Sequence, residues 1–438
     1  MDKLRQTHAT RATPGGFMHH AVYGTGYLAT VVSSCLADFG LPVTCFHEDV
    51  PRIASLARDE TPYYEKNLKE VVRRNVRSGR LAFSHDVERT CRKSLMIFIA
   101  QDSQDGLEEV ATRLSRFCTD DHILVISSPA PVGTASRIER SLRSAGSKIA
   151  IVSHPVFVTD GCAVEDFNWP DRILLGTDSN AAIQAMKMLY RPLVMRGVPV
   201  IVTNHETAEL AREASTAFLA TKISFINELA TLCEHVRADA VDLALALGLD
   251  KKIAPRCFQP GTSIGGPFVE AEMESLAQLA VSNGVSLKIL SAAREVNQSL
   301  CERIMTKLSS ALQSVQGKQV GLLGLAFKPN SNSVVASTSM QLAKRLVNMG
   351  AQVRAYDPAA IEGARAELNG SVRYCDNAYA AAEGVDALVL GTAWSEFRSL
   401  DYDRIKRSLK RPLIVDTKNI LDAVRMRSLG FEYVGIGR

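Results

Sequence analysis

The chain has 438 residues, a formal net charge of +4, 46% hydrophobic residues and 22% charged residues. Charges of both signs are interspersed, which excludes the basic footprint typical of nucleic-acid-binding proteins. The longest apolar runs are strand-sized, far below the roughly 20 residues of a membrane span. The 9 cysteines form no CxxC pair, so we expect reduced thiols in a cytoplasmic protein and no metal site.

The first part of the chain predicts a dinucleotide-binding domain over residues 17–207. Residues 1–16 are polar, lack the apolar segment of a secretory signal, and are expected to form a disordered extension. A short strand at 20–23 leads into GTGYLA, a GxGxxA turn that opens a helix. Such glycines let the backbone approach a pyrophosphate, whose charge the helix N-terminus favours. We therefore expect NAD to contact Gly24, Gly26, Tyr27 and Leu28.

The end of the second predicted strand departs from the dinucleotide-binding pattern. A carboxylate usually binds the adenosine ribose there, but VTCF is followed by His47. An imidazole cannot accept two hydroxyl hydrogen bonds as a carboxylate does. Glu48 is placed one residue late and is the candidate replacement. The alternative is that the fold persists while affinity for NAD has decayed.

The remaining pattern predicts an α/β protein with two Rossmann-like doubly wound domains joined by a central helical region. Buried strands are expected at 95–100, 123–127 and 149–153, as in a parallel sheet. Residues 208–310 are mostly helical in pattern, and residues 311–438 again alternate between strands and helices.

One helix of the central region places a lysine on an apolar face. In TAFLATKISFINELA, Phe218, Lys222, Phe225 and Leu229 recur at helical spacing. A lysine at such a position extends to solvent, pairs with an anion or faces a ligand. The alternative is a purely structural core helix.

Several blocks, in order, make the chain resemble the UDP-glucose/GDP-mannose dehydrogenase family, most closely its members acting on UDP-glucose. The resemblance implies an NAD-binding domain, a central dimerisation region and a UDP-sugar-binding domain. It also implies oxidation of the C6 alcohol of UDP-glucose to a carboxylate through a cysteine thioester, supplying polysaccharide precursors. The blocks are GTGYLA (24–29), GRLAFSHD (79–86), PVGT (131–134), AVEDFNWPDRILLG (163–176), FLATKISFINE (218–228), GLAFKPN (324–330) and FEYVGIGR (431–438).

The resemblance carries over only part of the family's catalytic set. Lys222 and Asn227 match the lysine and asparagine that stabilise an oxyanion and orient water. Glu272 stands for an aspartate, whereas the nucleophilic cysteine position is Phe268. Cys257 lies where the family has an ordinary apolar residue, so it is a poor substitute.

Further losses point the same way. The family's glutamate is Val156, its threonine before PVGT is Pro129, and its GTP turn is replaced by Gln101-Asp102-Ser103. Loss of a nucleophile lowers a rate by many powers of ten. The resemblance therefore implies an oxidoreductase with lost or strongly reduced turnover. The alternative is a non-catalytic nucleotide-sugar-binding protein, either a homodimer or a heteromer that regulates an active paralogue.

The resemblance also suggests contacts to a UDP-sugar. Arg256, Lys328 and Lys418 are candidate phosphate contacts, and Gly265 and Gly266 allow a close approach of the loop backbone. Lys418 replaces an arginine, which keeps the charge but loses bidentate geometry. The alternatives are solvated basic side chains and an ordinary glycine-rich turn.

Overall fold

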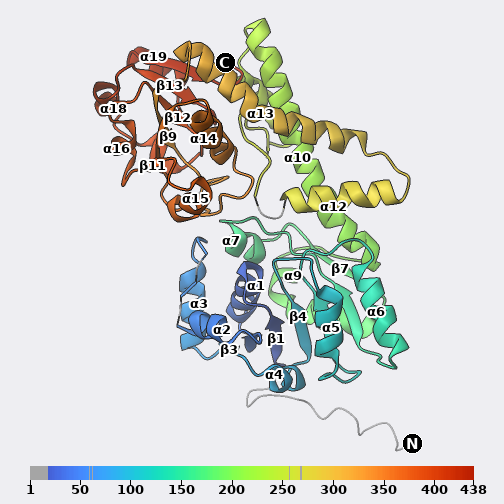
Figure 1. Cartoon of the computed structure of the whole chain (residues 1–438). Helices are drawn as coiled ribbons and strands as arrows, with labels where there is room; N and C mark the ends of the chain where they lie inside the picture. The colour runs from blue at the N-terminus through green and yellow to red at the C-terminus, as the bar shows by residue number, and fades with distance from the viewer. Residues whose placement is uncertain (1–17, 59, 62, 256, 267–268) are drawn as a thin grey trace, which may run out of the picture. The chain divides into compact units, whose positions relative to one another are not determined.

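The computed structural model describes residues 18–58, 60–61, 63–255, 257–266 and 269–438 (Figure 1). It divides into two compact units, one ending at Glu213 and the other beginning at Ala214. The predicted extension at 1–16, Arg256 and Phe268 lie outside the described residues. The three-part division predicted at residues 207 and 310 stays a proposal.

Unit 1 is built on an eight-stranded sheet whose strand order reverses between β1 and β4. Strands pair in parallel except for β6 with β7. Ligands of open α/β sheets bind at such a reversal, beyond the carboxyl ends of the strands. In spatial order the strands are β3 (Leu81–Ser84), β2 (Val43–Phe46), β1 (His20–Tyr23), β4 (Met96–Ile99), β5 (Ile123–Ile126), β6 (Ala150–Ser153), β7 (Ile173–Gly176) and β8 (Val200–Thr203).

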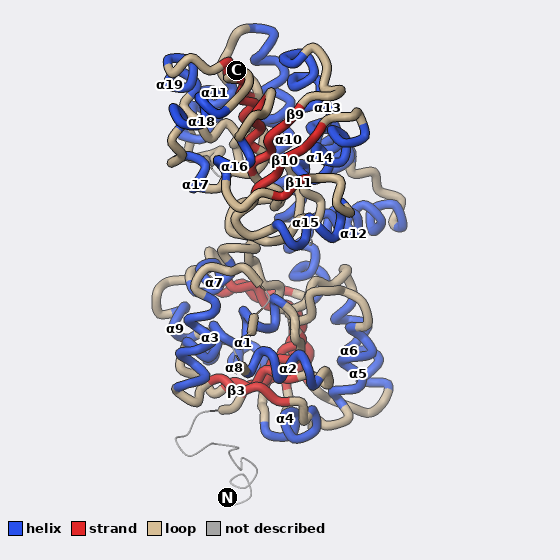
Figure 2. The backbone as a smooth tube through the Cα atoms, turned by 60° about the vertical axis from the view of Figure 1, so that its left-hand side comes forward, coloured by secondary structure: helices blue, strands red, loops and turns tan. Residues whose placement is uncertain are grey.

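Helices cover both faces of this sheet, with α5 and α6 on one side and α1 and α3 on the other (Figure 2). Every residue of α1 except its last is buried, which explains its mostly apolar and small side chains. The helices are α1 (Tyr27–Asp38), α2 (Val50–Ala57), α3 (Leu68–Arg77), α4 (Val87–Lys93), α5 (Leu107–Ser115), α6 (Thr134–Ser144), α7 (Ala163–Asn168), α8 (Asn180–Leu189) and α9 (Arg191–Val194).

The long helix α10 (His205–Val236) runs from unit 1 into unit 2. Three further helices follow it: α11 (Ala240–Leu249), α12 (Val269–Ser282) and α13 (Lys288–Leu312). Among the described residues, none of the helices is both long and apolar enough to cross a membrane.

A six-stranded parallel sheet completes unit 2, and Leu300, Ile304 and Leu308 of α13 belong to the same hydrophobic core as its strands. Its strands, in spatial order, are β11 (Arg373–Tyr374), β10 (Gln352–Tyr356), β9 (Gln319–Leu323), β12 (Ala387–Leu390), β13 (Leu413–Asp416) and β14 (Glu432–Gly435). Its helices are α14 (Thr338–Asn348), α15 (Ile361–Leu368), α16 (Ala378–Ala382), α17 (Ser395–Arg398), α18 (Tyr402–Ser408) and α19 (Ala423–Ser428). The predicted fold class, two Rossmann-like sheets joined by a helical region, is confirmed.

Candidate functional site

The glycine-rich turn after β1 lies at the reversal of strand order in unit 1. Gly24 has φ +141°, and a Cβ added to it would lie 2.8 Å from the Ala100 carbonyl oxygen. A Cβ on Gly26 would lie 2.1 Å from Oδ2 of Asp102. Both glycines are therefore required by close approach, the first to backbone and the second to a carboxylate.

Asp102 occupies the N-terminus of α1. Its Oδ2 accepts a hydrogen bond from the Tyr27 amide at 2.8 Å, and its Oδ1 accepts one from the Leu28 amide at 2.8 Å. The preceding Gln101 is held by its own amide, which donates to Ser128 Oγ at 2.7 Å. Burial raises the pKa of the Asp102 carboxyl, against the opposing effect of the two amides.

From the sequence we interpreted residues 101–103 only as the loss of a GTP turn, so this contact was missed. The sequence showed only that a carboxylate follows the strand expected at 95–100. In the structure that strand, β4, pairs with β1 on the side opposite β2, which brings the segment after it to the turn after β1. A carboxylate there meets the unpaired amides that begin α1.

The two residues at the position expected to bind the ribose, His47 and Glu48, are already bonded to other groups of the chain. Glu48 accepts a hydrogen bond from Tyr23 Oη at 2.9 Å and pairs with Arg113 Nη2 at 3.0 Å. Nδ1 of His47 accepts the Asp49 amide at 3.0 Å, and burial lowers the His47 pKa. A neutral His47 with an acceptor Nδ1 carries its proton on Nε2, so it offers one donor where a carboxylate offers two acceptors.

The N-terminus of a second helix of unit 1 is also capped by a carboxylate of the chain. Glu209 on α10 accepts hydrogen bonds from the Gly133 amide at 2.6 Å and the Ala135 amide at 2.8 Å. These amides lie at the start of α6, within and just after the PVGT block. Burial raises the Glu209 pKa to about 7, although both amides act to lower it.

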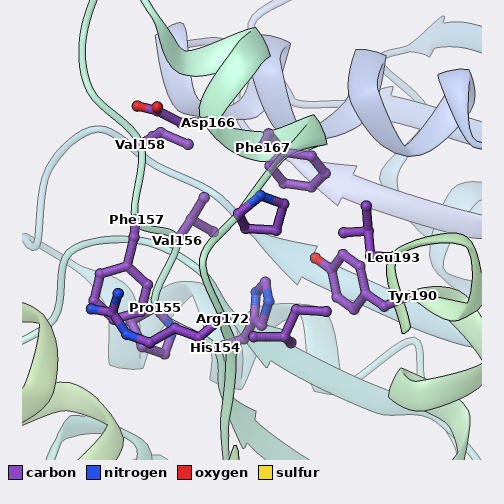
Figure 3. A pocket seen from close by; sticks show the side chains of 12 residues that line it. His154, Pro155, Val156, Phe157, Val158, Asp166, Phe167, Arg172, Tyr190 and Leu193 are labelled. Atoms are coloured by element: carbon purple, nitrogen blue, oxygen red, sulfur yellow. The ribbon is translucent and has the colours of Figure 1, made fainter. Parts of the chain in front are cut away.

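The position of the family's glutamate, Val156, lines a cavity of about 30 Å³ together with its neighbours in 154–158 (Figure 3). The backbone there is fixed, since Arg212 Nη1 donates to the Val156 carbonyl at 3.1 Å. His154 stacks on Tyr190 with ring centroids 5.3 Å apart, and burial lowers its pKa to about 4. The volume suits one or two water molecules, so this cavity is too small for a sugar.

In unit 2, the ammonium of Lys222 is bonded to backbone. It donates to the Ile253 and Ala254 carbonyls, both at 3.1 Å, and lies 4.5 Å from the Phe258 ring centroid. These contacts hold the turn that follows α11. The next segment, residues 259–266, is named the glycine loop below.

Asn227 and Lys418 meet on the glycine loop. The Asn227 amide group donates to the Thr262 carbonyl at 2.7 Å, and its oxygen accepts the Gly261 amide at 2.8 Å. Lys418 Nζ donates to the Gly261 carbonyl at 2.9 Å, and burial lowers its pKa to about 8. Gly261 has φ +87°, and an added Cβ would lie 1.9 Å from the Thr417 carbonyl oxygen. Both polar side chains therefore position this loop.

The end of the glycine loop packs on the turn after β9. A Cβ on Gly265 would lie 2.7 Å from the Ala336 carbonyl oxygen, and the Gly266 amide donates to the Val335 carbonyl at 3.2 Å. Gly266 has φ +104°, and its missing Cβ leaves room for the Phe327 ring at 2.8 Å. Gly265 and Gly266 were expected to let the loop backbone approach a ligand closely. In the structure they approach the chain's own backbone and the Phe327 ring.

Two predicted residues lie on other segments of unit 2. Lys328 Nζ lies 5.4 Å from the Phe327 ring centroid. Glu272 on α12 is buried and accepts a hydrogen bond from Thr216 Oγ1 on α10 at 2.6 Å. Within the described part of the chain, no group of three or more His, Cys, Asp or Glu residues is placed to hold a metal ion.

Comparison with known proteins places these features in one family. Models of the UDP-glucose/GDP-mannose dehydrogenase family match the chain in three parts. They are the NAD binding domain over residues 18–194, the central domain over 206–299 and the UDP binding domain over 321–423.

Individual relatives match over nearly the whole chain. The UDP-glucose 6-dehydrogenase of Rhizobium meliloti (strain 1021) is 35% identical, covering 96% of this chain and 100% of its own. UDP-glucose 6-dehydrogenase TuaD of Bacillus subtilis (strain 168) is 35% identical, covering 95% and 93%. The structure of a UDP-glucose dehydrogenase from Pyrobaculum islandicum aligns with a TM-score of 0.87 at 30% identity, covering 97% and 99%. The chain belongs to the UDP-glucose/GDP-mannose dehydrogenase family.

Proposed function

We propose that this chain is a UDP-glucose 6-dehydrogenase-like protein whose four-electron oxidation has been lost or strongly reduced. The observation that carries the proposal is Phe268 at the position matching the family's nucleophilic cysteine. An aryl side chain cannot add to an aldehyde, so neither the thiohemiacetal nor the thioester of the family reaction can form there.

The persistence of Lys222 and Asn227 does not argue against this proposal. Lys222 donates to two backbone carbonyls, and Asn227 is 1% exposed and bonded to the glycine loop at both ends of its amide. These contacts give each residue a structural reason to remain without chemistry. They are the roles that a fold would keep after turnover had gone.

Binding of a UDP-sugar by unit 2 forms the second part of the proposal. The match to the family's UDP binding domain supports it. The bond from Lys418 to Gly261 favours loop positioning for this lysine over direct phosphate contact. Lys328 and Arg256 stay as the proposed phosphate contacts.

The alternative function is a non-catalytic dimer partner, either of itself or of an active paralogue. It is favoured by apolar side chains left exposed on α10 and α11, including Phe218 at 65% and Leu249 at 75%. Exposed apolar groups of this kind mark protein interfaces. Light scattering should give twice the chain mass for the purified protein, and Phe218→Glu should shift it to one chain mass. A single-chain mass for both would contradict this alternative.

The loss of turnover is tested by restoring the thiol. Phe268→Cys alone should yield no NADH from NAD and UDP-glucose above the wild-type background, because Val156 and Pro129 also lack the groups of the family pattern. The matched comparison is the triple variant that combines Phe268→Cys with Val156→Glu and Pro129→Thr. Robust NADH production by the single variant would contradict the proposal.

A further inference from the structure

We propose that Asp102 is an internal substitute for the pyrophosphate of a dinucleotide. Its carboxylate fills the anion position of the turn at 24–26, and it must leave before a dinucleotide binds there. The proposal concerns this turn alone, and it stands or falls independently of whether unit 2 binds a UDP-sugar.

The geometry is that of a bound anion. A dinucleotide-binding turn receives a phosphate on the first amides of its helix, against a glycine that lacks a Cβ. Here the two oxygens of Asp102 accept the Tyr27 and Leu28 amides, both at 2.8 Å. Oδ2 also lies 2.1 Å from the point where a Cβ of Gly26 would be. The space that Gly26 leaves open is therefore filled by a carboxylate.

Two anions cannot share this position. A phosphate oxygen on the same amides would overlap the Asp102 carboxylate, and the like charges would repel. With Asp102 in place, the residues of the turn do not fit the NAD that the family implies. Glu48, the candidate ribose-binding carboxylate, is itself bonded to Tyr23 and Arg113.

Asp102 lies at the start of an exposed loop. Residues 103–106 are exposed, and Gly106 has φ +69° just before α5. The backbone just before Asp102 is anchored by the Gln101 amide, which donates a hydrogen bond to Ser128 Oγ. Displacing Asp102 therefore breaks two charge-assisted hydrogen bonds without disturbing the core of unit 1.

The apparent affinity for a dinucleotide should then equal the intrinsic affinity of the open turn multiplied by the fraction of molecules in which Asp102 has left the turn. If Asp102 occupies the turn in nine molecules of ten or more, its removal tightens binding by about tenfold or more. An uncharged side chain of equal size should give an intermediate gain.

The test is calorimetric titration of the full chain with ADP, which carries a pyrophosphate and no nicotinamide. We expect Asp102→Ala to bind ADP at least about tenfold more tightly than wild type, with Asp102→Asn between them. Asp105→Ala is the matched control, because it removes an exposed carboxylate from the same loop and should bind as wild type does. UDP-glucose, titrated separately, reports on unit 2 and should bind all four proteins equally.

Hydrogen exchange supplies a readout that does not depend on affinity. The Tyr27 and Leu28 amides should exchange faster in Asp102→Ala than in wild type, and ADP should restore their protection. If Asp102→Ala fails to fold, Asp102→Asn carries both measurements. ADP binding by the folded variant within twofold of wild type, or unchanged exchange of both amides, would overturn the proposal.

Discussion

Asp102 in unit 1 and Asp357 in unit 2 each accept hydrogen bonds from two amides in the segment that follows a central strand, β1 in unit 1 and β9 in unit 2. Asp357 Oδ2 accepts the Leu325 amide at 2.7 Å, the Ala326 amide at 3.0 Å and Trp394 Nε1 at 3.1 Å. Asp357 is 1% exposed, whereas Asp102 is half-buried on a loop whose following residues are exposed.

The difference lies in what else depends on each carboxylate. Oδ1 of Asp357 also accepts the Ala359 and Ala360 amides, both at 2.8 Å, so this one side chain organises the turns after both β9 and β10. Asp102 closes a turn that opens directly into α1 and lies at the reversal of strand order. The carboxylate–amide hydrogen bonds in unit 2 are therefore part of the fold, whereas we propose that those in unit 1 can be replaced by bonds to a bound pyrophosphate.

The largest expected effect is on stability. Asp357→Ala removes the shared acceptor of five hydrogen bonds, four of them buried, and should lower the free energy of unfolding by about 3–5 kcal/mol. Asp102→Ala should lower it by only about 1 kcal/mol, because it removes the acceptor of two hydrogen bonds that are only partly buried. The chain has two tryptophans, Trp169 in unit 1 and Trp394 in unit 2. Asp102→Ala is therefore measured in a Trp394→Phe background, where Trp169 reports urea unfolding of unit 1, and Asp357→Ala in a Trp169→Phe background, where Trp394 reports unit 2. Equal losses in the two variants, each against its own background, would contradict the expected difference.

The next largest effect is on the pH dependence of the free energy of unfolding. It concerns Glu209, which caps the N-terminus of α6. Because its folded-state pKa is about 7, above the ordinary value of 4.5, the folded protein holds a proton that the unfolded chain releases. Stability should therefore fall as pH rises from about 4.5 to 7, by roughly 3 kcal/mol from this group.

Glu209→Gln should remove that contribution from unfolding curves measured at several pH values. His154 and His20, whose pKa values are lowered by burial to about 4, act with the opposite slope in every variant. The difference between variants is therefore the quantity to compare. The exposed Glu206→Gln is the control. Parallel curves for wild type and Glu209→Gln would show that Glu209 does not titrate in this range.

The sequence predicted most of the fold because buried parallel strands have an unambiguous pattern. The strands expected at 20–23, 95–100, 123–127 and 149–153 match β1, β4, β5 and β6 to within one residue at each end. Such segments are recognised by their short, nearly continuous apolar composition.

The bonding of the site could not be predicted in the same way. Spacing placed Lys222 on an apolar face but could not show that its partners are the carbonyls of Ile253 and Ala254. Nor did the substitution at 101–103 reveal that Asp102 would reach the amides of α1. Both contacts join segments far apart in sequence, so they depend on tertiary geometry that no local pattern encodes.

The chain has the family's fold, and we propose that it lacks the family's four-electron oxidation. The decisive experiment is to incubate the purified protein with NAD and UDP-glucose and to follow NADH by absorbance, with calorimetry of UDP-glucose in parallel. We expect measurable UDP-glucose binding without NADH formation. Two NADH per UDP-glucose would contradict the proposed loss of turnover, because another residue would then have to supply the nucleophile that Phe268 cannot.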